Sequence, residues 1–531
     1  VAKVLTENGF AVRAMVRPTS PRSQLGGVTE FAEGDLRDEL SVRRAMHGVR
    51  YVFHVAADYR LWVPRPAEIY RTNVDATVAL VRAAQAAGVE RIVYTSSVAT
   101  LTVSNVAPSI VTPPASLTVF VGDTAAFSVT AASTAIPRFA HAQGARKVAL
   151  YANVGADLTH YDVDVAGAAL IKRETVTLPA GVQYAWPHRS RRYLYVATSS
   201  SASGYGKPGT EHHVTAFRID PTTGALTKHG ESIRLPTRPI HMTLDIPSQH
   251  ILVAFNNPSA LHIYRINKDF TPGEEVKQGA MDAGIFAHQV RVTPDNRHVI
   301  LVTRGNEATP QKAEDPGALK VFDYKNGVLS NETVIAPHGG KEYGPRHLDF
   351  HPTKPWMYVS IETQNKMHMH RMQGGKPLPE VVYSKETLAE PNNIRSRQAA
   401  STVHVHPNGR FLYGANRSQD TVDFEGKKVY KGGENNIVVY AIDQKTGEHT
   451  PIQHIETQAI HPRTFHIDPS GRMLVAQHNL PVDVRDGSTV RTVSAGLSVF
   501  RMGSDGKLSF ARKYDIDVGN SIMFWMGMVP L

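Results

Sequence analysis

Five segments of this chain share one arrangement of apolar and polar residues around a proline. The segments align without a gap from six residues before the proline to ten residues after it. The shared prolines are Pro247, Pro294, Pro352, Pro407 and Pro469. A spacing that recurs in this way indicates an array of similar supersecondary units, which must be recognised before any single motif is interpreted.

Each repeated segment predicts an antiparallel hairpin. The proline follows a short alternating strand, as in HLDFHP, and precedes a turn and a second apolar strand, as in WMYVSIE. A third strand such as GALKVFDY follows, and then a weaker fourth strand. Four antiparallel strands at a period of about 50 to 60 residues are typical of a β-propeller blade.

The number of units predicts an all-β propeller with seven blades. Apolar segments near Tyr151 and Tyr195 supply second strands for two blades beyond the five aligned segments. The unit at Tyr151 lacks a clear first strand upstream, whereas the C-terminal segment VGNSIMFWMGMV belongs to no other blade. We therefore predict that the C-terminus supplies the innermost strand of the first blade, which closes the ring and removes exposed sheet edges.

Polar residues gather at both ends of the repeated window. Six residues before the prolines lie His241, His288, Arg346, Ser401 and Arg463, and ten residues after them lie Asn257, Arg304, Glu362, Arg417 and Asn479. Because a hairpin doubles back, these two ends lie at one edge of the blade. The first strand of every blade lines the channel of a propeller, so both sets are expected to meet at one mouth.

Residues 1–104 alternate between helical and strand patterns and resemble an extended short-chain dehydrogenase/reductase of the NAD-dependent sugar epimerase type. The resemblance is carried by Gly34-Asp35-Leu36, Val55-Ala56-Ala57 and Tyr94-Thr95-Ser96-Ser97. The first strand and the glycine-rich turn that would hold the pyrophosphate are missing, as is the Tyr-x-x-x-Lys pair. We expect a truncated Rossmann-like fragment without nicotinamide chemistry.

Two short segments follow this fragment. Residues 105–134 resemble the opening strands of a bacterial immunoglobulin-like domain, and are too short to close a sandwich. Residues 135–142 end in Ala140-His141-Ala142, a pattern like the end of a secretory signal peptide. We interpret the chain as a mosaic in which residues 143–531 form the complete propeller. Exposed strand edges in the truncated segments favour self-association.

Composition excludes several classes of site. The chain has no cysteine, which rules out disulfides and thiolate chemistry. Its net charge of +10 is spread over interrupted lysines and arginines, so we expect no nucleic-acid partner. The chain has no apolar run long enough to predict a membrane span. We expect this chain in the cytoplasm, and the protein from which its propeller derives in the periplasm or secreted.

The propeller segment resembles the seven-bladed lactonase family, which includes one class of 6-phosphogluconolactonase and the carboxymuconate cyclases. The resemblance is carried by Gly344-Pro345-Arg346-His347 through Glu362, by the segment from His404 to Arg417, and by Pro462-Arg463 through Arg472. It implies a metal-independent hydrolase that opens a small-molecule lactone without a cofactor. The functional positions of the family fall on His288, Arg346, Glu362 and Arg417.

The chemistry of lactone opening suggests a role for each of these residues. Arginines stabilise an oxyanion and bind anionic groups. A carboxylate between arginines has a lowered pKa, so we expect Glu362 to orient the arginines or a water. His288, with an ordinary pKa of about 6.5, is the better acid/base. We expect secondary substrate contacts from His241, Arg304, His347 and Arg463.

Two other interpretations stay open at this stage. The propeller could be a non-catalytic module that binds a protein or a carbohydrate, or a cyclase that forms a muconolactone. Polar residues at a channel mouth can also bind only water or form an ion network between blades. The pairs His404 with His406 and His368 with His370 have a spacing compatible with a metal, but a packing role is the simpler expectation.

Overall fold

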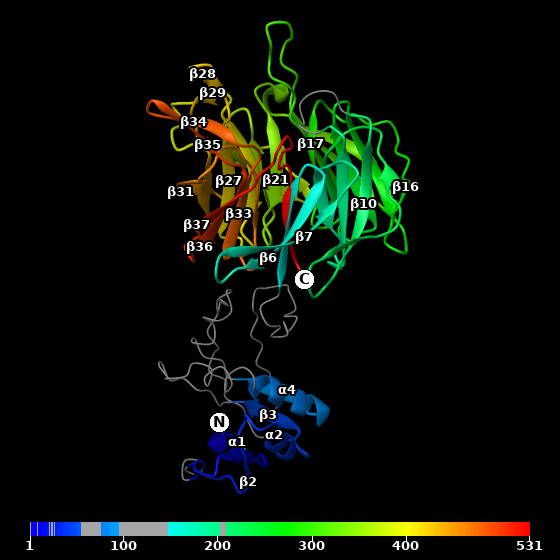
Figure 1. The fold of residues 1–531 in the computed structure, drawn as a ribbon. Coiled ribbons are helices and arrows are strands. Elements are labelled where there is room, and N and C mark those ends of the chain that lie inside the picture. The colour runs from blue at the N-terminus through cyan, green and yellow to red at the C-terminus, as the bar shows by residue number, and fades with distance from the viewer. Residues whose placement is uncertain are drawn as a thin grey trace. The chain divides into compact units, whose positions relative to one another are not determined.

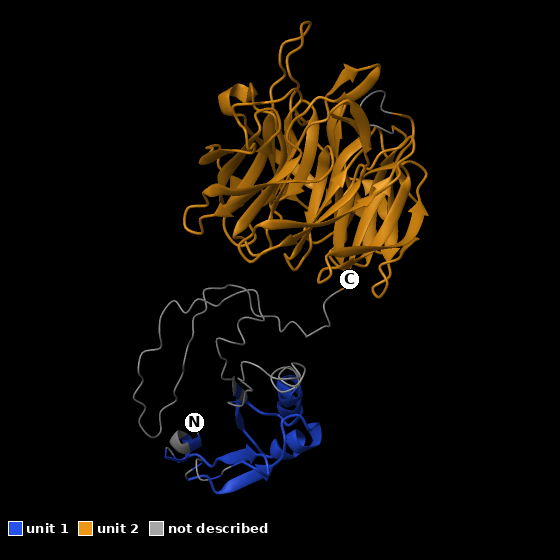
Figure 2. Ribbon diagram, turned by 60° about the vertical axis from the view of Figure 1, so that its left-hand side comes forward, with its two compact units in different colours: residues 1–140 blue, residues 141–531 orange. Residues whose placement is uncertain are grey.

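The computed structural model contains two compact units, residues 1–140 and residues 141–531 (Figure 2). The residues described are 2–54 apart from 8, 21, 23, 24 and 26, and then 76–94, 147–201 and 209–531. The immunoglobulin-like segment and the signal-peptide remnant expected from the sequence lie outside these residues. The boundaries expected within the first 142 residues therefore stay predictions.

The first unit has the alternating helices and strands expected from its sequence. Its elements are α1 (Ala2–Glu7), β1 (Arg13–Val16), β2 (Glu30–Glu33), α2 (Glu39–Ala45), β3 (Tyr51–His54), α4 (Ala76–Ala86) and β4 (Arg91–Tyr94). Strand β1 pairs with β2 and β3 pairs with β4, both in parallel. Strand β2 was not anticipated. None of the helices in the described ranges is long and apolar enough to cross a bilayer.

The second unit is an all-β propeller of seven blades, as predicted (Figure 1). Listed from the inner strand outward, blade 1 is β38 (Met526–Pro530), β5 (Val148–Val154), β6 (Asp157–Asp164) and β7 (Ala169–Thr177); blade 2 is β8 (Gly181–Pro187), β9 (Tyr193–Ser199), β10 (His212–Ile219) and β11 (Leu226–Lys228) with β12 (Ile233–Arg234); blade 3 is β13 (Pro239–Leu244), β14 (His250–Asn256), β15 (Ser259–Ile266) and β16 (Pro272–Glu275).

The remaining four blades follow the same order. Blade 4 is β17 (Ala287–Val292), β18 (His298–Thr303), β19 (Ala318–Lys325) and β20 (Val328–Ile335); blade 5 is β21 (Pro345–Phe350), β22 (Trp356–Ile361), β23 (Lys366–Gln373) and β24 (Lys376–Pro377) with β25 (Tyr383–Glu386); blade 6 is β26 (Ala399–Val405), β27 (Phe411–Arg417), β30 (Asn436–Ile442) and β31 (His449–Glu456); blade 7 is β32 (Pro462–Ile467), β33 (Met473–His478), β36 (Gly496–Met502) and β37 (Leu508–Asp515). A short 3₁₀ helix, η3 (Pro337–Gly340), precedes blade 5.

The ring closes as the sequence predicted. Strand β38 pairs with β5 from Met526 opposite Ala152 to Pro530 opposite Val148. The apolar core is divided into clusters that each join two consecutive blades, and one of them joins Leu150 of blade 1 to Val475 of blade 7. Because both faces of a blade are covered in this way, second strands such as β14 are buried along their whole length.

Tyrosines of the second strands link neighbouring blades. The hydroxyl of Tyr358 in blade 5 donates a hydrogen bond of 2.9 Å to the carbonyl of Gly447, in the turn between the third and fourth strands of blade 6. The equivalent bonds join Tyr151 to Gly224, Tyr195 to Phe270 and Tyr413 to Gly506, at 2.6, 2.8 and 2.7 Å. The recurring tyrosine therefore holds successive blades in register.

Replacing Tyr358 with phenylalanine is expected to lower the free energy of unfolding by about 1 to 2 kcal/mol, because the carbonyl of Gly447 loses its buried donor. Urea unfolding followed by circular dichroism measures the change. The partly exposed Tyr383 provides the control, and Tyr383→Phe should change the value by less than about 0.5 kcal/mol. Equal effects of the two substitutions would exclude this hydrogen bond as a source of stability.

The gapless alignment of the repeats is wrong by one residue in blade 3. In blade 4 the turn after the first strand is closed by a hydrogen bond from the backbone N–H of Thr293 to the carbonyl of His298, and the proline comes next. In blade 3 the same bond starts at Asp245, so Ile246 rather than Pro247 is the equivalent residue. Proline is accepted at more than one position of a surface turn, and so does not define register.

Two added hairpins lie at the same end of the propeller (Figure 1). Strands β28 (Thr421–Phe424) and β29 (Lys427–Tyr430) follow the second strand of blade 6, and β34 (Val482–Asp486) and β35 (Thr489–Val493) follow that of blade 7. The guanidinium of Arg485 lies 4.2 Å from the ring centre of Phe424. The hairpins therefore extend the wall beside the ends of the second strands, where the second polar set was predicted.

Candidate active site

Bulges near the start of the inner strands position three of the predicted residues. In β17, β21 and β32 the pairing register shifts across one residue, which is His288, Arg346 and Arg463 respectively. A bulged residue has no partner in the ladder, and the local bend changes the direction of its side chain. All three line one cavity of about 20 Å³, which has room for about one water molecule.

At two further positions of the inner strands, the structure differs from the set of residues predicted from the repeat. In blade 3 the bulged residue is Ile240, and His241 follows it, so His241 occupies the position of His347 rather than that of Arg346. In blade 2 the bulged residue is Gln183, which lines the same cavity. Sequence reasoning missed Gln183 because the turn of blade 2 carries Arg189 where blades 4 to 7 have a proline.

Glu362 follows the second strand of blade 5 and meets arginines from three blades. Its Oε2 lies 2.9 Å from Nε of Arg346 and 3.0 Å from Nη2 of Arg417. Its Oε1 accepts a hydrogen bond of 3.1 Å from Nη1 of Arg304. The two columns of the repeat therefore meet, as the spacing predicted.

The charges of this cluster determine its protonation. Burial would raise the pKa of Glu362, but the attraction of Arg417, Arg346 and Arg304 outweighs it and holds the pKa at about 2. Glu362 is therefore ionised at neutral pH and a weak base. One carboxylate faces three guanidiniums, and Arg463 adds a fourth, so the mouth keeps a positive charge that suits an oxyanion or a carboxylate.

His288 does not titrate near neutrality, contrary to the expectation from its ordinary pKa. Burial, together with the charges of Arg346, Arg463, Arg304 and Arg417, holds the pKa of His288 well below its usual range. The imidazole is therefore neutral at pH 7. Its Nδ1 is buried and has no hydrogen-bond partner among the described residues. This atom can therefore accept a hydrogen bond from a bound molecule, or donate one to it, depending on the tautomer.

Three imidazoles from the inner strands of blades 3, 4 and 5 lie next to one another. The ring centre of His347 lies 5.2 Å from that of His288 and 6.1 Å from that of His241. The ring of Tyr184 lies 3.9 Å from His241 on the other side. Burial first, and then the charge of Arg346, holds the pKa of His347 well below its usual range, so this imidazole is also uncharged.

Arg463 is held from the side of blade 1. Its Nε donates a hydrogen bond of 3.2 Å to the carbonyl of Phe524, and its guanidinium lies 3.7 Å from the centre of the Phe524 ring. The hydroxyl of Ser401 donates to the carbonyl of Arg463 at 2.8 Å. Ser401 therefore supports the backbone beneath the site.

His461 is a site residue that the repeat did not reveal. Nη1 of Arg417 donates to its Nε2 at 3.2 Å, and its Nδ1 donates to Oδ1 of Asn479 at 2.9 Å. Asn479 thus fixes the tautomer that accepts from Arg417. The only signal in the sequence was the position of His461 directly before Pro462-Arg463.

The four histidines considered for a metal have packing roles. The ring of His406 bonds the carbonyl of Gly471 at 2.9 Å, and that of His370 bonds the carbonyl of Leu378 at 3.0 Å. The ring of His368 stacks on that of Tyr343, and Nδ1 of His404 lies 3.6 Å from Oδ2 of Asp349. Among the described residues, no group of three or more histidine, aspartate or glutamate side chains is placed to hold a metal ion.

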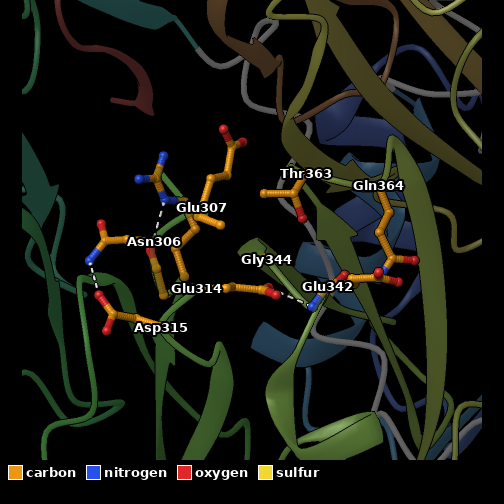
Figure 3. A pocket seen from close by; sticks show the side chains of 11 residues that line it. Asn306, Glu307, Glu314, Asp315, Glu342, Gly344, Thr363 and Gln364 are labelled. Atoms are coloured by element: carbon orange, nitrogen blue, oxygen red, sulfur yellow. Dashed lines mark hydrogen bonds between the residues drawn. The ribbon is translucent and has the colours of Figure 1, made fainter. Parts of the chain in front are cut away.

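A larger pocket of about 360 Å³ opens beside Arg304 (Figure 3). Asn306, Glu307 and Asp315 lie on one side of it, and Thr363 and Gln364 lie on the other. Arg304 lines this pocket and also binds Glu362, so the pocket adjoins the arginine cluster.

A family model described as "Lactonase, 7-bladed beta-propeller" matches residues 147–483, which is more than half of the chain. The chain belongs to this lactonase family. Among curated proteins, a 6-phosphogluconolactonase of Bacillus subtilis is 26% identical over 339 residues, which cover 62% of this chain and 88% of the relative.

Solved structures share the fold of this lactonase propeller. A putative 6-phosphogluconolactonase from Bacteroides uniformis has a TM-score of 0.54 and 17% identity, with 72% of this chain and 100% of that chain covered. A periplasmic gluconolactonase from Pseudomonas aeruginosa has the same TM-score and identity, with 72% and 99% covered. A second family model, for NAD-dependent epimerases and dehydratases, matches residues 1–113 and agrees with the resemblance of the first segment.

Proposed function

We propose that the lactonase propeller hydrolyses a small-molecule lactone at the mouth of its channel. The observation that carries the proposal is the Glu362 cluster, in which one buried carboxylate orients three guanidiniums beside the neutral imidazole of His288. Lactone opening needs donors for the oxyanion, a proton acceptor for the attacking water and a proton for the departing alkoxide. Membership of the lactonase family supports the same class of reaction.

Each group has a role in this reaction. Arg346 and Arg417 donate hydrogen bonds to the carbonyl oxygen as it becomes an oxyanion, and Glu362 keeps both guanidiniums in place. His288 accepts a proton from the attacking water and delivers it to the ring oxygen as the acyl C–O bond breaks. Water thus adds a hydroxyl group to the carbonyl carbon and a proton to the alkoxide, which yields a hydroxy acid. Arg463 and His347 provide further contacts to the bound lactone.

The low pKa of His288 is compatible with this role. The arginines that depress it are the groups that bind the developing oxyanion. A negative charge placed among them cancels part of their field at the imidazole, which raises the pKa of His288 when a proton acceptor is needed. The histidine is therefore a poor base before substrate binds and a better one during the reaction.

Proton release in a pH-stat tests the function. The full chain is expected to hydrolyse at least one member of a panel of five- and six-membered lactones well above the spontaneous rate, because each turnover at neutral pH liberates a carboxylate and a proton. Failure with every lactone on the panel, phosphorylated and plain, would contradict the proposal and favour a propeller that only binds its ligand.

His288→Gln is expected to lower kcat about 100-fold with little change in KM, because glutamine can form hydrogen bonds but cannot accept the proton from water. Steady-state kinetics on the best lactone of the panel measure both constants. His338→Gln, at an exposed position within η3, is the matched control and should leave them unchanged. An unaltered kcat in His288→Gln would remove His288 from the reaction.

A further inference from the structure

The 360 Å³ pocket beside Arg304 is rich in carboxylates (Figure 3). Its lining includes Glu307, Glu314, Asp315 and Glu342. Its volume lies in the range of small-molecule sites, whereas the central cavity admits about one water molecule. Arg304 both lines the outer pocket and binds Glu362, so we take the rest of a substrate whose carbonyl lies among the arginines to occupy this pocket.

Local contacts hold the acidic wall in place. The strand-like arm that carries it is closed by paired backbone hydrogen bonds between Asn306 and Asp315, at 3.3 and 2.9 Å. The side chain of Asn306 donates to the carboxylate of Asp315 at 2.9 Å. Across the pocket, a carboxylate oxygen of Glu314 accepts from the backbone N–H of Glu342 at 2.5 Å. The carboxylates are thus presented by a preformed wall.

Most of this negative charge is not neutralised. Lys312 lies 2.5 Å from the carboxylate of Asp315 and balances that residue. Of the residues that the structure describes, no cation forms an ion pair with the carboxylates of Glu307, Glu314 or Glu342. Arg304 lines the pocket, but its guanidinium is bound to Glu362. The site therefore has a positive inner part at the arginines and a negative outer part at the arm.

We infer that the substrate is an uncharged polyhydroxy lactone, whose hydroxyl groups donate hydrogen bonds to the carboxylates of the outer pocket, rather than a phosphorylated one. The inference rests on the proposed function, because it takes the carbonyl to lie among the arginines. A phosphate group at the end remote from the carbonyl would face three uncompensated carboxylates, whereas hydroxyl groups find acceptors there.

The test compares kcat/KM of the full chain for glucono-1,5-lactone and for its 6-phosphate. We expect a preference of at least 10-fold for the neutral lactone. The preference should shrink as salt is added, because salt screens repulsion at a partly exposed site. In the double variant Glu307→Gln/Glu314→Gln, the ratio of the two kcat/KM values should fall at least 10-fold. Glu231→Gln/Glu274→Gln, with Glu231 between β11 and β12 and Glu274 on β16, removes the same charge elsewhere and should leave the ratio unchanged.

The possible failures are distinguishable. If both lactones are opened and the phosphorylated one is preferred, or if the double variant leaves the ratio unaltered, the substrate class is wrong and the proposed function stands. If neither these two lactones nor any other of the panel is opened, the proposed function itself fails, and the substrate class falls with it.

Discussion

Glu362→Gln is expected to lower kcat/KM for lactone hydrolysis more than about 1,000-fold, beyond the usual effect of removing one oxyanion donor. A glutamine has one acceptor oxygen and an NH₂ group that faces N–H donors, so at least one of Arg304, Arg346 and Arg417 loses its partner. The free energy of unfolding should also fall, by about 3 to 5 kcal/mol, because buried guanidinium charge is left without compensation.

Activity and folding must be measured on the same samples of this variant, with kinetics below its unfolding temperature and circular dichroism as the check on fold. Glu386→Gln is the matched control, since Glu386 pairs with Lys366 at 3.8 Å on the surface of blade 5. Its effect should stay below about 1 kcal/mol, with activity unchanged. A folded Glu362→Gln protein with full activity would show that the cluster is only an ion network between blades.

Acid is expected to destabilise the propeller steeply below about pH 6. Burial first of all lowers the pKa of His368, His466 and His478 to about 3 and that of His449 to about 4. The unfolded chain binds a proton at each of them near its ordinary pKa of about 6.5, whereas the folded protein stays neutral. These buried neutral histidines therefore contribute fully to the free energy of unfolding above about pH 6.5. The contribution is lost as the pH falls toward their pKa values in the folded protein.

The size of this effect follows from linkage. Each such histidine changes the free energy of unfolding by about 1.4 kcal/mol per pH unit, so four together change it by roughly 5 kcal/mol per unit between about pH 6 and pH 4. Urea unfolding at a series of pH values, followed by near-ultraviolet circular dichroism, measures the slope.

A single substitution separates histidine from other sources of acid sensitivity. His478→Gln should reduce the slope by about 1.4 kcal/mol per pH unit, while His338→Gln at its exposed position should not change it. A free energy of unfolding that is flat from pH 7 to pH 5 would contradict the assignment of neutral buried histidines.

The architecture and much of the site were predictable because both depend on local spacing that each blade repeats. The same hairpin geometry places Arg346, Glu362 and Arg417 at equivalent ends of their strands, so a count along the sequence was enough to bring them together. Closure of the ring was predictable because the first blade lacked a first strand and the C-terminal strand belonged to no blade. In the structure, β38 is the innermost strand of that blade.

The remaining features depend on contacts that no spacing encodes. His241 was placed in the wrong position because the proline of blade 3 lies one residue later in its turn. His461 has a positive φ of 57°, and its ring bonds Arg417 of another blade. The pKa of His288 is set by burial and by arginines from neighbouring blades, so its ordinary value was a poor guide.

The most direct test of the account is the ratio of kcat/KM between Arg346→Lys and the unsubstituted protein on a lactone that it opens. Lysine keeps the charge but cannot place two donors in the plane of the guanidinium. Arg410→Lys, at an exposed turn of blade 6, is the matched control. We expect a loss of about 100-fold for Arg346→Lys and less than twofold for Arg410→Lys. Equal activity of the two variants would contradict lactone opening at the arginine cluster.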